Sequence, residues 1–181
     1  MKIHFVTGNK NKFKEAKDIL KDFDVEQIEI DLPELQGEPE EIVKEKSKIA
    51  AEKSGKAVFV EDTSLCFDAL NGLPGPYVKD FVKKIGIPGL AELALKYDDT
   101  SATALVCIGY CEPEKEPFVF QGRVIGSIVS PRGDQGFQWD QIFMPEGYDK
   151  TFAEMSFEEK NKTSHRKLAF EEFRKWLTKQ K

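Results

Sequence analysis

A short run of β-forming residues that leads directly into two carboxylates constrains this chain most. Val58, Phe59 and Val60 are followed at once by Glu61 and Asp62. A short apolar run bounded by turn residues is typical of a buried strand, and in open α/β sheets ligands bind beyond the carboxyl ends of such strands. We therefore expect the acidic pair at the rim of a sheet. Alone, such a pair is more often a solvated turn or a helix cap, so the hypothesis of a catalytic site depends on the rest of the chain.

Length and charge restrict the class of protein. The chain has 181 residues, a formal net charge of -5, 33% charged and 40% hydrophobic residues. This length predicts one domain over residues 1–181, arranged as two lobes around a cleft, and the acidic balance argues against a polymeric nucleic acid as partner. Three cysteines, Cys66, Cys107 and Cys111, fit neither a disulfide framework nor a zinc site, which predicts a reduced, cytoplasmic location. The start of the chain has no leader pattern and no apolar run reaches membrane-spanning length, so we expect no membrane partner.

The first candidate site is the turn at residues 7–12. Residues 2–6 are typical of a strand, and apolar residues between Phe13 and Leu20 recur at helical spacing. A strand, a small-residue turn and a helix start place free backbone N–H groups and a positive dipole end together, which suits an anion, and Lys10 and Lys12 add positive charge. Asn and Gly before a helix are equally typical of a plain cap, and the Walker pattern is absent, so both interpretations stay open.

A second strand at residues 25–30 and a Pro- and Gly-containing loop at 31–39 precede a helix predicted over residues 40–54. Lys46 falls on the apolar stripe of that helix, four residues after Ile42. A lysine there either extends its ammonium outward along the stem, the commoner outcome, or reaches into a wet cleft.

The second half of the chain predicts helix 88–96 after a shorter helix, and a hairpin of long strands at residues 101–111 and 117–130. The loop-like segment at 136–143 carries Phe137 and Trp139, which act either as a stacking platform or, more commonly, as a core plug.

The last helix is predicted to begin at Ser164, a good N-cap, and Arg166 lies on its inward face in the first turn. A cation there opposes the helix dipole, which indicates a ligand. A lone histidine is more often structural, so His165 is given a role only beside Arg166.

Four segments together resemble the inosine triphosphate pyrophosphatase family, which hydrolyses non-standard purine nucleoside triphosphates. They are TGNKNK at 7–12, VEDTSLCFDALNGLPGPYV at 60–78, FQWDQIF at 137–143 and EKNKTSHR at 159–166. The DLPELQGEPEEI run at 31–42 looks like the eukaryotic branch of that family. The resemblance covers essentially the whole chain, with the motifs in the order of the family.

The resemblance implies a role for each matching residue. It places the metal on Glu34 and Asp62, with Mg²⁺, or Mn²⁺ in its place, as cofactor, and makes Asp62 the catalytic residue that acts on the attacking water. The implied substrate-binding residues are Thr7, Gly8, Asn9, Lys10, Asn11, Lys12, Lys46, Asp62, Thr63, Lys79, Phe137, Gln138, Trp139, Asp140, Lys160, His165 and Arg166. Of these, Phe137 to Asp140 with His165 and Arg166 would enclose the base. The implied fold is an elongated two-lobed α/β structure with a long mixed sheet and a central nucleotide cleft, and the implied assembly is a homodimer.

The chain departs from the family at two positions, since Gln138 and Gln141 stand where the family usually has Gly and Pro. The motif therefore defines the base preference less well than it defines the reaction. The implied reaction is attack of water on the α-phosphorus, with Glu61 in an assisting role. Two alternatives remain: a pyrophosphatase for modified pyrimidine nucleotides and a non-catalytic nucleotide sensor. His165 and Arg166 suit the edge of a keto purine, which argues against the pyrimidine alternative. A sensor needs no carboxylate pair, which argues against the second alternative. For an acidic protein to bind a triphosphate, we expect the lysines to make the cleft locally positive.

Overall fold

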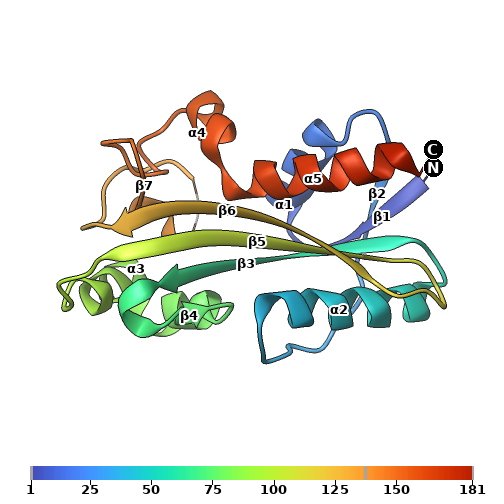
Figure 1. The fold of residues 1–181 in the computed structure, drawn as a ribbon, viewed down its shortest axis with the longest axis horizontal. Coiled ribbons are helices and arrows are strands. Elements are labelled where there is room, and N and C mark those ends of the chain that lie inside the picture. The colour runs from blue at the N-terminus through green and yellow to red at the C-terminus, as the bar shows by residue number, and fades with distance from the viewer. Residues whose placement is uncertain (1, 137, 181) are drawn as a thin grey trace. The chain divides into compact units, whose positions relative to one another are not determined.

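The computed structural model describes residues 2–136 and 138–180, and its fold confirms the α/β class with a mixed, helix-flanked sheet (Figure 1). Seven strands form the sheet in the order β2-β1-β3-β5-β6-β7, with β4 paired to β3. The strands are β1 (Lys2–Val6), β2 (Asp24–Ile28), β3 (Val58–Phe67), β4 (Pro74–Gly75), β5 (Ser101–Cys111), β6 (Phe118–Ile128) and β7 (Phe143–Pro145). The α-helices are α1 (Lys10–Ile19), α2 (Pro39–Ser54), α3 (Val78–Ala94), α4 (Phe157–Thr163) and α5 (His165–Lys179), and two 3₁₀ turns are η1 (Asp68–Leu70) and η2 (Gln138–Gln141).

The sheet is mixed because its N-terminal strands are parallel and later ones are not. β1 pairs in parallel with β2 and β3, whereas β3–β4 and β6–β7 are antiparallel. Parallel neighbours need a crossover connection, which α1 and α2 supply for the first three strands. The chain divides into two compact units, and the unit boundaries fall inside β3, β5, β6 and α5.

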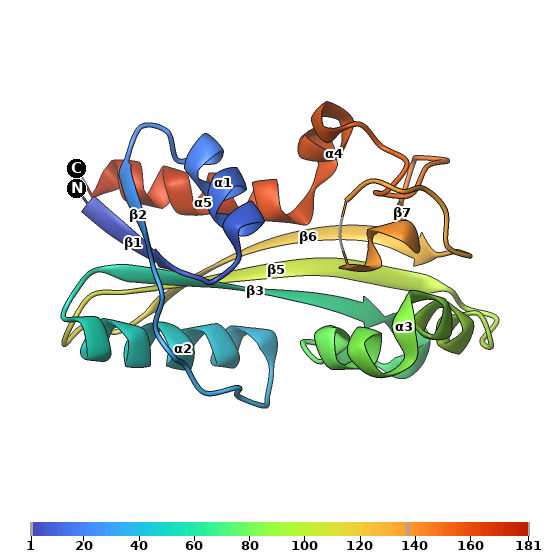
Figure 2. The ribbon, with the colours of Figure 1, turned by 180° about the vertical axis from the view of Figure 1, so that it is seen from behind.

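Unit 1 consists of Met1–Asp62, Val106–Gly122 and Leu168–Lys181. Its core is rich in aromatic residues: Phe5 stacks on Phe59 with ring centroids 4.5 Å apart, and Phe170 and Phe173 of α5 meet Phe59 edge-on or tilted. Helices α1 and α5 lie on this face, while α2 lies on the opposite face of the strands (Figure 2). Phe170 and Phe173 are fully buried.

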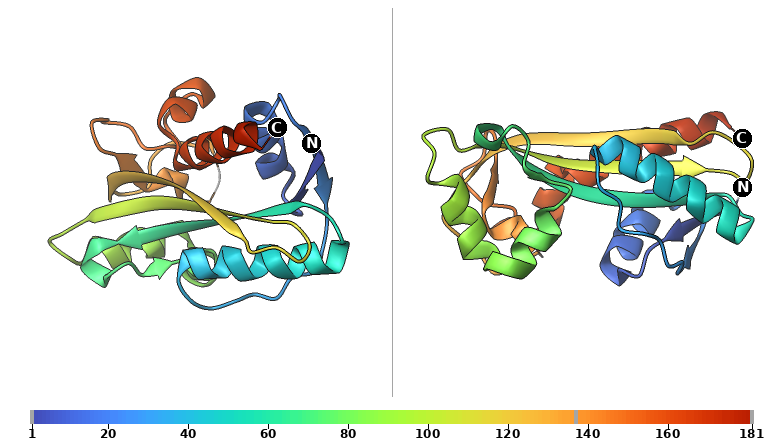
Figure 3. Two further views of the ribbon diagram at one scale, coloured as in Figure 1. Left: turned by 45° about the vertical axis from the view of Figure 1, so that its right-hand side comes forward. Right: turned by 90° about the horizontal axis from the view of Figure 1, so that it is seen from below.

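Helix α2 approaches the sheet closely, and this approach places Lys46. A Cβ atom at Gly109 of β5 would lie 2.2 Å from the carbonyl oxygen of Val43, so only glycine admits the helix backbone at this point. Gly55 ends the helix in the left-handed conformation, as predicted for a C-cap glycine. Figure 3 shows α2 along this face of the unit from two further sides.

Unit 2 consists of Thr63–Leu105 and Arg123–Lys167. Its core joins Leu90 and Ala91 of α3 to Trp139, Phe143 and Phe152. The two successive helices expected before residue 96 are both within α3, where Gly86 separates them with a non-helical φ of 71° and ψ of 175°. None of the helices in the described part of the chain is long and apolar enough to cross a membrane.

Candidate functional site

The carboxylates Glu61 and Asp62 lie within β3, and the prediction that they end a strand is wrong. β3 continues to Phe67, and its later residues Leu65 and Cys66 pair with β4. The apolar residues after the acidic pair keep the strand going, since Leu65 and Phe67 are buried in unit 2. Successive side chains of a strand point to opposite faces, so the two adjacent carboxylates meet different partners.

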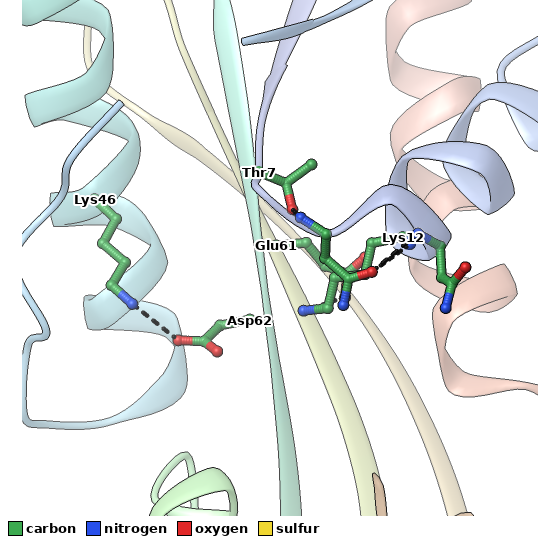
Figure 4. A network of polar contacts seen from close by, with 7 residues as sticks. Thr7, Lys12, Lys46, Glu61 and Asp62 are labelled. Atoms are coloured by element: carbon green, nitrogen blue, oxygen red, sulfur yellow. Dashed lines mark hydrogen bonds and ion pairs between the residues drawn. The ribbon is translucent and has the colours of Figure 1, made fainter. Parts of the chain in front are cut away.

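Asp62 shares a lysine with Glu34. The Lys46 ammonium lies 3.4 Å from Asp62 Oδ2 (Figure 4). It also lies 3.5 Å from Glu34 Oε2, so carboxylates from a strand and from the loop before α2 converge on one cation. The side chain of Lys46 is 17% exposed, whereas that of Glu34 is 82% exposed. Of the two alternatives for Lys46, the structure therefore shows the one in which the ammonium turns toward the carboxylates.

Glu61 meets a different lysine on the other side of β3. Its Oε1 atom lies 3.1 Å from Lys12 Nζ, and its side chain is 0% exposed, against 14% for Lys12 (Figure 4). A buried carboxylate is stable only when paired or well hydrogen-bonded. Glu61 and Lys12 therefore form a buried ion pair between β3 and the first turn of α1.

The turn at residues 7–12 is a helix cap in this structure, and its side chains accept several of its own backbone N–H groups. Asn9 Oδ1 accepts hydrogen bonds from the backbone N–H groups of Asn11 and Lys12, and Thr7 Oγ1 accepts one from the N–H of Asn9. These contacts fix the first turn of α1, on which Lys12 stands.

A pocket of about 550 Å³ in unit 1 gathers several predicted residues. Its lining is formed by Val6, Thr7, Gly8, Glu29, Ile30, Asp31, Leu32, Glu34, Lys46, Val60 and Glu61. Four of these carry carboxylates and one carries an ammonium group. The expectation of a locally positive cleft is therefore not met by this lining, and an anionic ligand needs additional cations to bind here.

Two acidic residues of this lining, Glu29 and Asp31, were missed by sequence reasoning. They lie directly after β2 (Asp24–Ile28), and Lys53 of α2 donates a hydrogen bond of 2.8 Å to the backbone carbonyl of Asp31. The residues that follow a parallel strand were a signal available in the sequence, because the same rule was applied to Glu61.

In unit 2, Asp140 and Lys160 form a short pair. Lys160 Nζ lies 2.6 Å from Asp140 Oδ2, and these side chains are 16% and 6% exposed. The ammonium also lies 5.4 Å from the centre of the Phe152 ring. Lys160 stands on α4, whose capping box joins the Ser156 hydroxyl to the N–H of Glu159 and the Glu159 carboxylate to the N–H of Ser156. The hydrogen bond from the backbone of Ser156, followed by that from Lys150, lowers the pKa of Glu159.

Trp139 is a core plug in this structure and also carries a buried donor. The residue is 2% exposed and its ring lies 5.4 Å from the His165 ring. Within the described part of the chain, its indole N–H is buried without a hydrogen-bond partner. A buried orphan donor is unusual in proteins, and an acceptor on a ligand would satisfy it.

His165 and Arg166 begin α5 after Ser164, as predicted, and each is 4% exposed. Ser164 Oγ accepts the N–H of Lys167 at 3.1 Å. The predicted inward position of Arg166 in the first turn of α5 is therefore confirmed. A buried guanidinium at this end of a helix is costly unless other groups compensate its charge.

Gln141, one of the two departures from the family pattern, secures the loop before η2. Its Nε2 donates to the carbonyl of Gly133 at 3.1 Å, which a proline cannot do. Gly136 closes the same loop at φ 79°, and a Cβ there would lie 2.2 Å from Asp140 Oδ2. The segment from Gly133 to Gly136 is therefore packed directly against the paired carboxylate.

For the remaining predicted residues, the structure gives the element on which each lies. Lys10 and Asn11 are exposed on the first turn of α1, Thr63 lies in β3, and Lys79 is exposed at the start of α3. Phe137 lies outside the described residues, and for Gln138 only the backbone in η2 is described. The described residues contain no group of three or more His, Cys, Asp or Glu side chains placed to hold a metal.

Comparison with known proteins shows similarity along the whole chain. The sequence pattern of the Ham1 family matches residues 3–176. An inosine triphosphate pyrophosphatase of Tuber melanosporum is 49% identical over 178 residues, covering 97% of this chain and 96% of the relative. One of Scheffersomyces stipitis with the same name is 47% identical over 191 residues, covering 98% of each.

Solved structures give the same result for the fold. A HAM1 protein from Coxiella burnetii matches with a TM-score of 0.90 and 28% identity, covering 99% of both chains. A nucleoside-triphosphatase, also described as a dITP/XTP pyrophosphatase, from Mycobacterium abscessus matches with a TM-score of 0.77 and 29% identity, covering 96% of this chain and 98% of that one.

Proposed function

The chain belongs to the Ham1 family, and from this membership we propose that it hydrolyses non-standard purine nucleoside triphosphates (ITP, dITP and XTP) to the monophosphate and pyrophosphate. The relatives named inosine triphosphate pyrophosphatase support the reaction, and the neighbour described as a dITP/XTP pyrophosphatase supports the substrate class. In the structure, the observation that carries the proposal is the convergence of Glu34, Lys46 and Asp62 beside a pocket that Thr7 and Gly8 also line.

A Mg²⁺ ion, or Mn²⁺ in its place, fits the donor set at Glu34 and Asp62. Mg²⁺ prefers oxygen ligands and usually takes one or two carboxylates together with substrate phosphates and waters. The two carboxylates already share one cation, the Lys46 ammonium, and the acidic lining of the pocket requires more positive charge before a triphosphate can enter. When bound, the metal would supply Lewis-acid polarisation of the phosphate and lower the pKa of water.

In the proposed reaction, the protein's own side chains position the attacking water and neutralise the charge of the phosphates. Asp62 accepts a proton from the water that attacks the α-phosphorus, the bond from that phosphorus to the α–β bridging oxygen breaks, and pyrophosphate leaves. Lys46 and Lys12 would stabilise the developing charge on the leaving pyrophosphate. Thr7 and Gly8 of the turn at residues 7–12 line the pocket and would orient the phosphates.

The base of the nucleotide would be bound by polar groups of unit 2. Arg166 donates to O6 and N7 of a 6-keto purine, and the indole N–H of Trp139, which has no protein partner in the described residues, has an acceptor available on such a base. The His165 ring lies beside the Trp139 ring at an interplanar angle of 31°.

The resemblance also supports a homodimer as a further part of the proposal. A cytoplasmic location is proposed from the cysteines, because none of Cys66, Cys107 and Cys111 forms a disulfide, which agrees with a reducing compartment.

A substrate panel tests the proposed function. Purified protein with Mg²⁺ is incubated with ITP, dITP, XTP, GTP, ATP and modified pyrimidine triphosphates, and released pyrophosphate is quantified. We expect the highest kcat/KM for ITP, dITP and XTP. A preference for pyrimidine triphosphates, or nucleotide binding without pyrophosphate release, would overturn the proposal.

A further inference from the structure

Glu61 differs from every other carboxylate of the pocket lining in its environment. Its side chain is 0% exposed and is paired with Lys12 at 3.1 Å. Glu34, by contrast, is 82% exposed. Because a fully buried charge is stable only beside a fixed counter-charge, the position of the Lys12 ammonium is set by Glu61.

The attachment points of the two residues make this contact specific. Lys12 stands in the first turn of α1, which the Asn9 side chain fixes by accepting the N–H of Lys12 itself at 3.2 Å. Glu61 stands in β3, next to Asp62 but with a different partner, since Asp62 meets Lys46. A lysine side chain has four rotatable bonds and at a helix start would otherwise extend into solvent, away from the positive end of the helix dipole.

We infer that Glu61, which lines the pocket, is a positioning residue for the pyrophosphatase reaction: it holds the Lys12 ammonium 3.1 Å from its own carboxylate, and it is neither the general base nor a metal ligand. This inference rests on the proposed function. A prepositioned cation stabilises charge that develops on the leaving pyrophosphate without first losing side-chain entropy. Glu61 acts through Lys12, whereas Asp62 touches the reacting groups.

The inference predicts a split between kcat and KM for Glu61→Gln. This change keeps the size of the side chain and removes its charge, so the Lys12 ammonium is no longer held. We expect kcat to fall by about 10- to 100-fold, less than the ~10²–10³-fold lost when an electrostatic donor is itself removed, because Lys12 is still present. We expect KM to stay the same or fall, because removing a negative charge beside the pocket favours an anionic substrate.

A double-mutant cycle separates this role from the alternatives. Kinetics are measured for wild type, Glu61→Gln, Lys12→Met and the double variant, with Lys14→Met, an exposed lysine on the same helix, as the matched control. We expect the double variant to be no slower than Lys12→Met alone, since Glu61 has nothing left to position. Multiplicative losses in kcat, or an unchanged kcat in Glu61→Gln, would overturn the inference.

Two measurements do not depend on turnover. Thermal unfolding should show Lys12→Met melting below the double variant, because only Lys12→Met leaves the Glu61 carboxylate buried without its cation. Titration with Mn²⁺, followed by electron paramagnetic resonance, should give the same affinity for Glu61→Gln and wild type. A loss of Mn²⁺ affinity in Glu61→Gln would make Glu61 a metal ligand, and a double variant that melts lower than Lys12→Met would disprove the pairing. If wild type releases no pyrophosphate, the proposed function fails while these two measurements still judge the ion pair.

Discussion

At the scale of single residues, the alternation of a strand gives two adjacent carboxylates different tasks. Glu61 is buried and paired with Lys12, while Asp62 is 26% exposed and shares Lys46 with Glu34. Solvent access and a neighbouring carboxylate suit Asp62 for binding a hydrated metal and a water molecule, which Glu61 cannot reach in the same way. The account therefore assigns the chemistry to Asp62 alone.

Replacing Asp62 by Asn tests that assignment. The change preserves shape but removes the charge that holds metal and accepts the proton, and loss of one general base typically costs ~10²–10⁴-fold in rate. We expect kcat for ITP to fall in that range at saturating Mg²⁺, with little change in melting temperature. Asp98→Asn, at an exposed position, serves as the control. Near-normal turnover by the Asp62→Asn variant would remove Asp62 from the mechanism.

Arg166 carries the discrimination between 6-keto and 6-amino purines in this account. Its guanidinium, 4% exposed in the structure, pairs with O6 and N7 of a keto purine but not with the 6-amino group of adenine. Such a bidentate contact is worth ~1–3 kcal/mol of discrimination. Arg166→Ala should therefore lower kcat/KM for ITP strongly and for ATP hardly, which narrows their ratio.

The control for this experiment is Arg174→Ala, a partly exposed arginine on the same helix whose partner is Asp22. If the ITP to ATP ratio of kcat/KM is the same in Arg166→Ala as in wild type, other groups such as Trp139 and Asp140 read the base.

At the scale of elements, the short helix α4 matters because it carries Lys160. It spans seven residues, buries none of them, and is held at its start by the Ser156–Glu159 capping box. Helices this short are not stable through their own hydrogen bonds, so the cap and the pair between Lys160 and Asp140 hold the element together. This helix was not predicted, because the serine and glutamate of the capping box are followed by no apolar run.

Ser156→Ala measures the contribution of the cap. Loss of an N-cap hydroxyl costs about 1 kcal/mol, and here it would loosen the helix that supports Lys160. We expect a small drop in melting temperature, and a higher KM for ITP with kcat less affected. Thr178→Ala, near the end of α5, provides a comparison that removes a hydroxyl without removing a cap. Should KM stay at the wild-type value in Ser156→Ala, the position of Lys160 does not depend on α4.

The elements that periodicity could predict were the long ones. The strand at residues 101–111 matches β5, and the helix predicted over 40–54 differs from α2 by one residue at its start. The continuation of β3 past Asp62 and the short strand β7 could not be predicted, because pairing with distant residues such as Gly75 and Ile128 decides them. The direction of the Lys46 side chain could not be predicted for the same reason. Its ammonium points toward Glu34 and Asp62 because α2 packs closely on the sheet at Gly109.

At the scale of the whole molecule, each unit carries a distinct set of polar groups. Unit 1 holds Glu34, Lys46, Glu61 and Asp62, and unit 2 holds the pair of Asp140 and Lys160. The α/β class and the mixed sheet are confirmed, whereas the two lobes around a cleft and the homodimer stay predictions.

The central claim is that water attacks the α-phosphorus of the nucleotide, and isotope placement tests it most directly. ITP is hydrolysed with Mg²⁺ in water enriched in oxygen-18, and the products are analysed by mass spectrometry. The account predicts IMP and pyrophosphate in equal amounts, with one labelled oxygen in the phosphate of IMP and none in pyrophosphate. Label in pyrophosphate, which would indicate attack on the β-phosphorus, or labelled orthophosphate formed together with IDP would contradict it.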